Sequence, residues 1–413
     1  MSVIKSISEI APAARDASST HAPVGSYNLA VGYLRAFITL LVVAHHSVLA
    51  YFPYAPAPPP TLVAQPRLWA AFPVVDPHKW MGWTFFVGFN DVFFMSLMFL
   101  LSGLFVQRSL ERKGVGAFLR DRLLRLGVPF VFAAAVIAPL AYYPAYLMTA
   151  SPSGIAGYWQ QWRALGNWPA GPAWFIWLLL AFDVVAAALF VFARKLMAWL
   201  GRVVCGASAR PALLFVLVAA VSAVSYIPMA IHFSAERWSA FGPFYFQTSR
   251  LLHYFAYFLI AIAAGATAMP RGLFASDGRL ARRWPLWTSA MVLVYFMLVA
   301  FFIAMLSGIG KSWPWSILLG GLWVLSCAAS CFGFMSLFAR FATRRVVAFD
   351  SLTDNGYGMY LIHYAFVSWL QLALLRIAMP GLAKGALVFA GTVALSWGTI
   401  AALRRIPAVA RVI

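Results

Sequence analysis

Two ionisable side chains in the first apolar segment have a spacing that could support chemistry. Arg35 and His46 lie eleven positions apart in GYLRAFITLLVVAHHS. On a helix, eleven steps of about 100° end roughly 20° from three full turns, so the two side chains share a face. They are separated by roughly 16 Å along the axis, whereas His45 is rotated by about 100° and points elsewhere. Ionisable groups inside a membrane helix are costly and usually functional, so this stripe is the first candidate for a reaction centre.

Each residue of this stripe also has a purely structural interpretation. A histidine such as His46 often hydrogen-bonds a neighbouring membrane helix. Arg35 is six residues from the helix end and could extend its guanidinium to lipid headgroups. Their common face favours the functional interpretation, in which the imidazole acts as a base or a nucleophile near neutral pH.

Two carboxylates lie within predicted helices. Asp91 is about eight residues into the second apolar segment, close to the predicted depth of His46. There it could hold the imidazole tautomer, as the third member of a catalytic triad does. Asp183 falls near the middle of the fourth segment, where it could contact a substrate. For both residues, a buried carboxylate satisfied by another helix is an equal alternative.

A cluster of arginines precedes the third segment. Arg120, Arg122 and Arg125 lie in RDRLLRLGVPF, and the last two are three positions apart on one helix face. A guanidinium fork binds two phosphate oxygens while staying charged, so the cluster suits a phosphorylated ligand. The alternative is an anchor on anionic lipid.

The ninth segment adds polar groups at the same predicted end of the bundle. In NGYGMYLIHYAF, Tyr360 and His363 are three residues apart, and His363 lies near the predicted depth of Arg35. Together with the arginine cluster they predict an anion pocket. Trp174, at the start of the fourth segment, is either a substrate platform or an interfacial aromatic residue. The three cysteines match neither a paired framework nor a CxxC spacing, and we expect no metal.

The composition requires a membrane around these helices. The chain has 413 residues, of which 63% are hydrophobic and 10% charged, and its mean hydropathy is +0.82. Soluble globular proteins are much less apolar and much more charged. Continuous apolar runs of about twenty residues indicate helices, whereas membrane barrels show weak alternation over about ten. The predicted fold class is therefore all-α, a polytopic transmembrane bundle of about ten spanning helices.

The distribution of charge predicts the orientation. Of the Lys and Arg residues, 22 lie in connections on the side shared by both termini and 8 on the other, in addition to Arg35. By the positive-inside rule, both termini face the cytoplasm. The same rule accounts for the net charge of +20, so we expect contact with the lipid bilayer and not with nucleic acid. The ten predicted spans are 29–52, 83–106, 126–149, 173–193, 212–232, 251–269, 285–306, 315–338, 356–378 and 383–403.

Three parts of the chain follow from these spans. Residues 1–28 form a polar cytoplasmic tail, 29–403 the membrane domain and 404–413 a short basic cytoplasmic tail. The longest connection on the far side, 53–82, contains APAPPP together with Trp69 and Trp80. Proline-rich chain favours extended geometry and tryptophan prefers the headgroup region, so we expect either a semi-rigid lid or a plain interfacial linker.

Taken together, these segments resemble the membrane acyltransferase type 3 family, ten-helix enzymes that O-acylate surface polysaccharides, glucans and other extracytoplasmic acceptors. The resemblance spans about 29–403. Its most specific element is the family's pattern of Arg, ten residues and His in the first helix, matched by Arg35 and His46. Many relatives carry a histidine before the tryptophan of the fourth helix, where this chain has Ala173. The supporting segments are FFMSLMFLLSG, RDRLLRLGVPF, WFIWLLLAFD and YGMYLIHYAF.

The resemblance implies an acyl-CoA donor, usually acetyl-CoA, on the cytoplasmic side of a bacterial inner membrane. It implies an acceptor hydroxyl on the far side, carried by a glycan or a lipid-linked saccharide, with His46 catalytic and Arg35 essential. The predicted mechanism places Arg35, Arg122 and Arg125 on the CoA phosphates and uses His46 as a general base or acyl carrier. A non-enzymatic transporter or flippase for lipid-linked sugars is the alternative, because it would also place Arg, His and Asp on a polar path.

Overall fold

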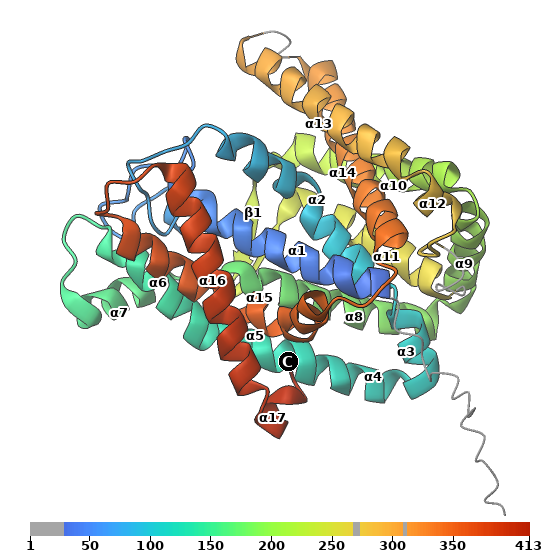
Figure 1. The fold of residues 1–413 in the computed structure, drawn as a ribbon, viewed down its shortest axis with the longest axis horizontal. Helices are drawn as coiled ribbons and strands as arrows, with labels where there is room; N and C mark the ends of the chain where they lie inside the picture. Colours follow the sequence, from blue (N-terminus) through green and yellow to red (C-terminus); the bar gives the residue numbers. More distant parts are fainter. Residues whose placement is uncertain (1–28, 267–272, 309–311) are drawn as a thin grey trace, which may run out of the picture.

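The computed structural model describes residues 29–266, 273–308 and 312–413, so the predicted tail over 1–28 lies outside it. Within these ranges nearly all regular structure is helical (Figure 1). The predicted polytopic helical bundle is confirmed. In the described ranges, nine helices are long and apolar enough to cross a membrane: Leu29–Tyr51, Trp83–Lys113, Val115–Leu147, Gly171–Phe192, Pro211–Phe233, Thr248–Ala266, Trp284–Leu306, Trp313–Phe341 and Gly381–Leu403.

Several of these spans are built from shorter helices joined end to end. The α-helices are α1 (Leu29–Val48), α2 (Trp83–Gly103), α3 (Val106–Lys113), α4 (Val115–Arg122), α5 (Val128–Phe132), α6 (Ala138–Leu147), α7 (Gly154–Ala164), α8 (Trp174–Phe192), α9 (Arg194–Ser208), α10 (Pro211–Phe233), α11 (Leu251–Ala266), α12 (Arg279–Arg282), α13 (Trp284–Leu306), α14 (Trp313–Phe341), α15 (Val347–Leu374), α16 (Gly381–Leu403) and α17 (Pro407–Ala410).

A further helix of membrane-spanning length, α15, has 28 residues and packs extensively on α1, α6 and α16. Its first turns carry the polar residues Asp350 and Asn355, and it is not among the nine helices selected by length and composition. The helix begins at Val347, whereas apolar residues alone predicted a start at 356. A polar helical turn packed against protein gives no hydropathy signal, which explains the difference.

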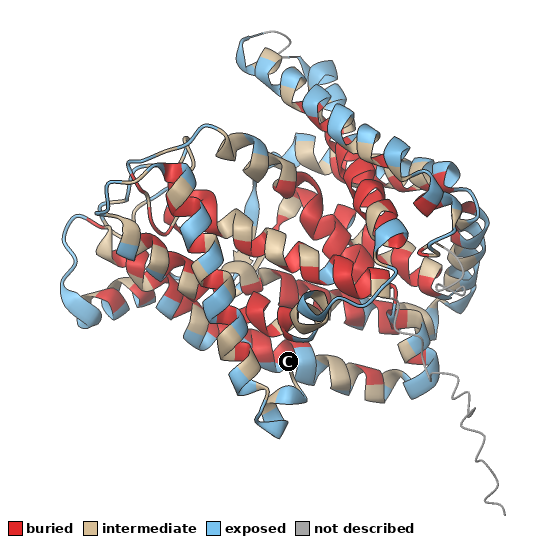
Figure 2. Cartoon of the chain, in the orientation of Figure 1, coloured by how far each residue is buried: buried red, intermediate tan, exposed pale blue. Residues whose placement is uncertain are grey.

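α1 and α15 lie parallel and in register. Tyr33 Oη donates to Asp350 Oδ1 at 2.8 Å, and His46 Nδ1 lies 3.1 Å from His363 Nε2. Both contacts join residues that are 317 positions apart, so the two helices run side by side between them. Burial is concentrated in the centre of the bundle, while α7, α9 and α13 at its periphery are largely exposed (Figure 2).

The span Val115–Leu147 contains two π-helical turns, η3 (Leu123–Gly127) and η4 (Ala133–Ile137). Each is followed closely by a proline, Pro129 or Pro139. Proline has no N–H and clashes with the carbonyl four residues earlier, so the helix widens locally to accommodate it. Some carbonyls four or five residues before a proline consequently have no main-chain donor.

Aromatic side chains supply hydrogen bonds to three such carbonyls, the third of which lies four residues before Pro144. Tyr357 and Trp369 both belong to α15, so this helix is fixed to the proline-containing span on either side of His363. The three bonds run from Tyr357 Oη to Arg125 O, from Trp168 Nε1 to Ala134 O at 2.7 Å, and from Trp369 Nε1 to Leu140 O at 2.9 Å.

The connection after α10 folds back into the bundle as a β-hairpin that the sequence analysis did not predict. β1 (Trp238–Phe241) pairs antiparallel with β2 (Phe244–Gln247). Trp177 Nε1 donates to the Tyr245 carbonyl at 2.9 Å, and the Phe244 ring stacks on Phe130 with centroids 5.5 Å apart. Phe130 lies near the middle of its span, so the hairpin reaches deep into the bundle (Figure 1).

The loop between α1 and α2 docks on α16 through a buried ion pair. Lys384 Nζ lies 2.6 Å from Asp76 Oδ2, and both side chains are 0% exposed. The backbone N–H of His78 donates to the other carboxylate oxygen at 2.8 Å. Gly381 packs on the His78 carbonyl so closely that a Cβ would lie 2.3 Å from that oxygen. Burial lowers the pKa of the neighbouring Lys79 ammonium, an effect that Asp76 opposes.

Candidate active site

Two imidazoles form the centre of the candidate site. Nδ1 of His46, near the end of α1, lies 3.1 Å from Nε2 of His363 in α15. His363 Nδ1 is 2.7 Å from the Tyr360 carbonyl, and His46 Nδ1 is also 2.9 Å from the Val42 carbonyl. His363 is fully buried, whereas His46 is half-buried. The His363 imidazole is therefore held in place by protein, and the His46 imidazole is accessible from outside the protein.

The structure corrects the predicted depth of His363. The sequence placed this residue beside Arg35, at the opposite end of α1 from His46. Because α15 begins nine residues earlier than predicted, His363 lies further along the helix and meets His46 instead. Tyr360, one turn away, is buried, and its hydroxyl donates to the Pro172 carbonyl. The proposed binding of CoA by Tyr360 and His363 thereby loses its geometric basis.

The loop between α1 and α2 reaches the imidazole pair through one tyrosine. The Tyr364 ring lies edge-on to His46 with centroids 5.1 Å apart, and its hydroxyl donates to the Ala70 carbonyl at 3.2 Å. Tyr142 of α6 donates to the same carbonyl at 2.9 Å. Gln371 Nε2 donates to the His46 carbonyl at 2.9 Å. The loop, α6 and α15 together fix the end of α1 that carries His46.

The expectation that Asp91 orients His46 is not met. Arg250 holds the Asp91 carboxylate with two hydrogen bonds, of 2.6 and 3.1 Å, and also donates to the Asp91 main-chain carbonyl at 2.8 Å. The Arg250 side chain is 6% exposed and that of Asp91 49%. Arg250 itself lies over the Trp323 ring, 4.9 Å from its centroid. The hydrogen-bonding contacts of the His46 ring in the described ranges are instead those with the Val42 carbonyl and His363.

Two residues predicted for different ligands contact each other. Arg122 Nε lies 3.2 Å from Asp183 Oδ2, and the Asp183 side chain is 1% exposed. The Arg122 guanidinium also lies over the Phe118 ring, 5.0 Å from its centroid. This pair links α4 to α8, so Arg122 neutralises a buried carboxylate rather than extending toward solvent.

The other predicted arginines are accessible. Arg35, Arg120 and Arg125 are all exposed. The main chain at Arg125 is fixed because its carbonyl accepts the Tyr357 hydroxyl. Trp174 is half-buried and packs between the hairpin and α11, with its ring 5.4 Å from Trp238 and 6.0 Å from Tyr254.

The sequence analysis missed a buried cluster next to the Asp91 ion pair. His253 Nε2 lies 3.0 Å from Ser96 Oγ and 3.6 Å from Cys327 Sγ, and all three side chains are at most 1% exposed. The cluster links α2, α11 and α14, and the Asp91–Arg250 pair links α2 to the 3-10 turn that precedes α11. Its members are separated by 74 residues or more, so no local spacing identifies it.

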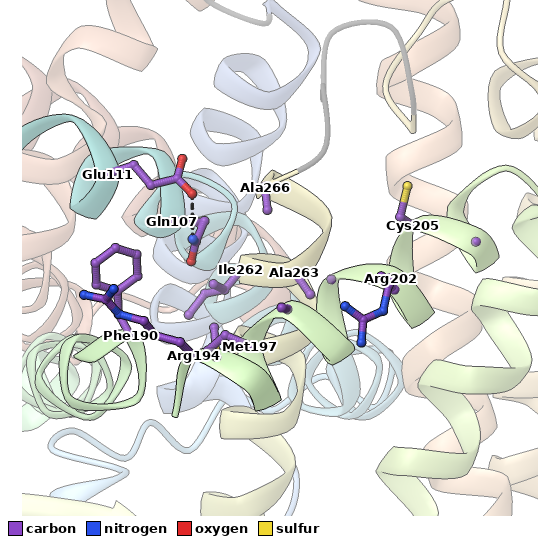
Figure 3. Close-up of a pocket in the computed structure, with 13 residues that line it drawn as sticks. Gln107, Glu111, Phe190, Arg194, Met197, Arg202, Cys205, Ile262, Ala263 and Ala266 are labelled. Atoms are coloured by element: carbon purple, nitrogen blue, oxygen red, sulfur yellow. Dashed lines mark hydrogen bonds between the residues drawn. The ribbon is translucent and has the colours of Figure 1, made fainter. Parts of the chain in front are cut away.

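A groove of about 630 Å³ lies among α3, α9 and the ends of α8 and α11, at the end of the bundle where α1 begins (Figures 1 and 3). Arg194 and Arg202 of α9 line it, as does Glu111, which accepts a hydrogen bond of 2.7 Å from Gln107. The rest of its lining is largely apolar. None of the predicted site residues lines this groove, so it is separate from the imidazole pair.

Comparison with known proteins places the chain in a family. No curated protein and no solved structure matches it. A family model described as an acyltransferase domain matches residues 28–401. The match covers nearly the whole chain and includes both imidazoles, the Asp91–Arg250 pair and all the arginines predicted to contact a ligand. The chain therefore belongs to the membrane acyltransferase type 3 family.

Proposed function

We propose that this protein transfers an acyl group, most simply acetyl, from cytoplasmic acyl-CoA to a hydroxyl of an extracytoplasmic glycan or lipid-linked saccharide. Membership of an acyltransferase family supports the reaction class. The nine apolar helices of the described ranges support a multi-pass membrane location. The excess of Lys and Arg in alternate connections supports a bacterial inner-membrane orientation with both termini in the cytoplasm.

The observation that carries this proposal is the hydrogen-bond chain through the two imidazoles. A carbonyl oxygen only accepts, so the Tyr360 carbonyl requires a proton on His363 Nδ1 and leaves Nε2 of neutral His363 as an acceptor. His46 Nδ1 faces this acceptor and the Val42 carbonyl, so it also carries a proton. This assignment of protons follows from the network. It leaves the lone pair on Nε2 of His46.

That lone pair supplies the chemistry. Nε2 of His46 removes the proton of the acceptor hydroxyl while the hydroxyl oxygen attacks the thioester carbonyl. The carbon–sulfur bond then breaks, the acyl group stays on the acceptor oxygen, and the imidazolium returns the proton to the departing thiolate as free CoA. His363 and the Val42 carbonyl accept from His46 Nδ1 and stabilise the transient positive charge. In an alternative mechanism, Nε2 of His46 attacks the thioester itself, and the resulting acyl-histidine transfers the acyl group to the acceptor hydroxyl.

The donor enters this scheme from the end of α1 that carries Arg35. The exposed guanidiniums of Arg35, Arg120 and Arg125 are proposed to bind the CoA phosphates, because their forks suit phosphate oxygens. The pantetheine arm would then run along α1 toward His46, roughly 16 Å away. Only the acyl group would pass to the acceptor side, so CoA need not cross the bilayer.

The decisive experiment combines turnover with product identification. Surface glycans and lipids from cells with and without the gene are compared by mass spectrometry for a missing acyl mass. Release of free thiol from acetyl-CoA is measured with the purified protein in nanodiscs. His46→Ala should abolish transfer while acyl-CoA binding persists, and His232→Ala, an exposed histidine of α10, serves as the matched control. Persisting transfer in His46→Ala would overturn the proposal, and a transporter would release no thiol at all.

A further inference from the structure

The β-hairpin needs a polar environment at a depth where lipid would not provide one. β1 and β2 form a two-stranded sheet, so the outer edge of each strand has no strand partner in the described ranges. Unpaired backbone N–H and C=O groups are costly in hydrocarbon. Stable membrane folds therefore do not expose open strand edges to lipid. Non-helical backbone at membrane depth is tolerated where protein buries it or where it lines water. Trp177 serves the Tyr245 carbonyl, but Trp238 and Phe241 are 47% and 71% exposed, so protein covers this hairpin only in part.

The Asp91 carboxylate gives a second, independent indication of water. It lies eight residues along α2, roughly 12 Å from the start of that helix. With 49% of its side chain exposed, an ionised carboxylate at this depth cannot face hydrocarbon. Arg250 occupies one side of the carboxylate and is itself buried, so the open side of the pair consists of carboxylate oxygens.

The hairpin and the ion pair adjoin in the chain and in space. Arg250 ends the 3-10 turn η6 (Thr248–Arg250), which directly follows β2. The N–H of Thr248 donates to the Arg237 carbonyl at 2.9 Å, which closes the base of the hairpin. Trp238 of β1 lies edge-on to Trp174, with centroids 5.4 Å apart. The hairpin therefore leads through η6 directly to the arginine that holds the exposed carboxylate.

We infer that the hairpin lines a water-filled vestibule that ends at Asp91, and that this carboxylate, fixed by Arg250, binds hydroxyl groups of the acceptor. An ionised carboxylate only accepts hydrogen bonds, and its lone pairs not used by Arg250 suit hydroxyl donors. The ion pair has no net charge, so a neutral polyhydroxylated acceptor fits it better than an anion. The identity of the occupant rests on the proposed acyl transfer, whereas the presence of water does not.

Cysteine accessibility tests the vestibule without any turnover. In nanodiscs of the Cys205→Ser protein, single cysteines are introduced and the rate of reaction with the cationic, water-soluble thiol reagent MTSET is measured. The matched control is Val224→Cys, because Val224 is 78% exposed yet belongs to the apolar α10 and faces lipid. We expect Asp91→Cys and Phe241→Cys to react at least about tenfold faster than Val224→Cys, as water-facing thiols do when lipid-facing ones stay protected.

Each labelling result decides the question. Phe241→Cys leaves the ion pair intact, so it remains informative if loss of Asp91 disturbs folding. Fast reaction of Phe241→Cys supports the vestibule, and a rate equal to that of Val224→Cys places the hairpin in lipid and overturns it. Val92→Cys, next to Asp91 but only 6% exposed, should react slowly.

The role of Asp91 is tested by pulse labelling of surface glycans with radioactive acetate in cells. Asp91→Asn should slow incorporation about tenfold or more, because a charge-assisted hydrogen bond to the acceptor is lost. Asp91→Glu should restore part of the rate, because it keeps a carboxylate at this position. Normal incorporation in Asp91→Asn would overturn the assignment. If wild-type cells show no incorporation, the proposed function fails while the labelling result for the vestibule stands.

Discussion

Nδ1 of His46 lies 3.1 Å from Nε2 of His363, and thirteen residues earlier on each helix Tyr33 donates to Asp350 at 2.8 Å. The register of α1 on α15 is therefore set at two points with the same offset of 317 positions. A slip of one residue would turn an imidazole by about 100° away from its partner. The contact between the imidazoles is thus a property of how two whole helices pack.

Replacing His363 should impair the transfer step more than the binding of acyl-CoA. Without His363, Nδ1 of His46 keeps only the Val42 carbonyl as an acceptor, so the imidazolium that forms during transfer is less stabilised. We expect His363→Ala to lower kcat about 100-fold or more with KM for acyl-CoA nearly unchanged, and His363→Gln to recover part of this loss. Steady-state thiol release measures both constants, and a kcat within about twofold of wild type would contradict the role given to His363.

Breaking the Asp76–Lys384 pair should destabilise the protein strongly. Lys384→Met leaves a fully buried carboxylate without its cation, which costs about 3–5 kcal/mol of the free energy of unfolding. Asp76→Asn combined with Lys384→Met should lose less than the sum of the single changes, because no uncompensated charge remains. Thermal unfolding in detergent gives the comparison. The exposed Lys113–Asp121 pair is the control, since Lys113→Met should change stability little.

The aromatic donors should compensate for the main-chain hydrogen bonds that the prolines remove, so substitutions of a proline and of its aromatic donor should not have additive effects on stability. Trp168→Phe removes the N–H that serves the Ala134 carbonyl and should cost about 1–3 kcal/mol of stability. Pro139→Ala returns a main-chain N–H within reach of the carbonyls four and five residues earlier. In the Trp168→Phe background, Pro139→Ala should therefore be less destabilising than in the wild type. Additive effects in this double-mutant cycle would show that the aromatic donor does not compensate for the proline.

The predicted CoA-binding arginines should separate into two groups. Arg120→Gln and Arg125→Gln remove exposed charges and should each weaken acyl-CoA binding several-fold with little change in stability, provided that they contact phosphate. Arg122→Gln should destabilise the protein, because Asp183 is left buried without its partner. Isothermal titration with acetyl-CoA and thermal unfolding distinguish the effects. Unchanged affinity in the Arg120→Gln, Arg125→Gln double variant would return these residues to the role of a lipid anchor.

Hydropathy predicts the helices well and their polar contacts poorly. Runs of twenty apolar residues located seven of the nine spans to within three residues at both ends, because burial in lipid is a local property of the chain. The spans Trp83–Lys113 and Val115–Leu147 extend further than predicted, into the polar helices α3 and α4. The depth of His363 was wrong because the polar first turns of α15 are buried in protein and not in lipid. The partner of Asp91 is 159 residues away in the chain, beyond the reach of any helical periodicity. Only packing selects Arg250 instead of His46 as that partner.

The hairpin, too, could not be predicted from the local sequence. Its strands have four residues each, and aromatic residues near a helix end also fit an interfacial belt. Nothing in the local sequence reports that this segment turns back into the bundle. Its position depends on the Trp177 donor to Tyr245 and on Phe130, which belong to other helices.

The ion pair between the first loop and the last long helix has a consequence for biogenesis. Asp76 precedes Lys384 by 308 positions in the chain, so Asp76 reaches its place before its partner has been synthesised. An ammonium in an apolar helix opposes stable insertion until a counter-charge neutralises it. Insertion of α16 therefore depends on its packing against Asp76. The loop between α1 and α2, which packs beside His46, is fixed only when synthesis of the chain is nearly complete.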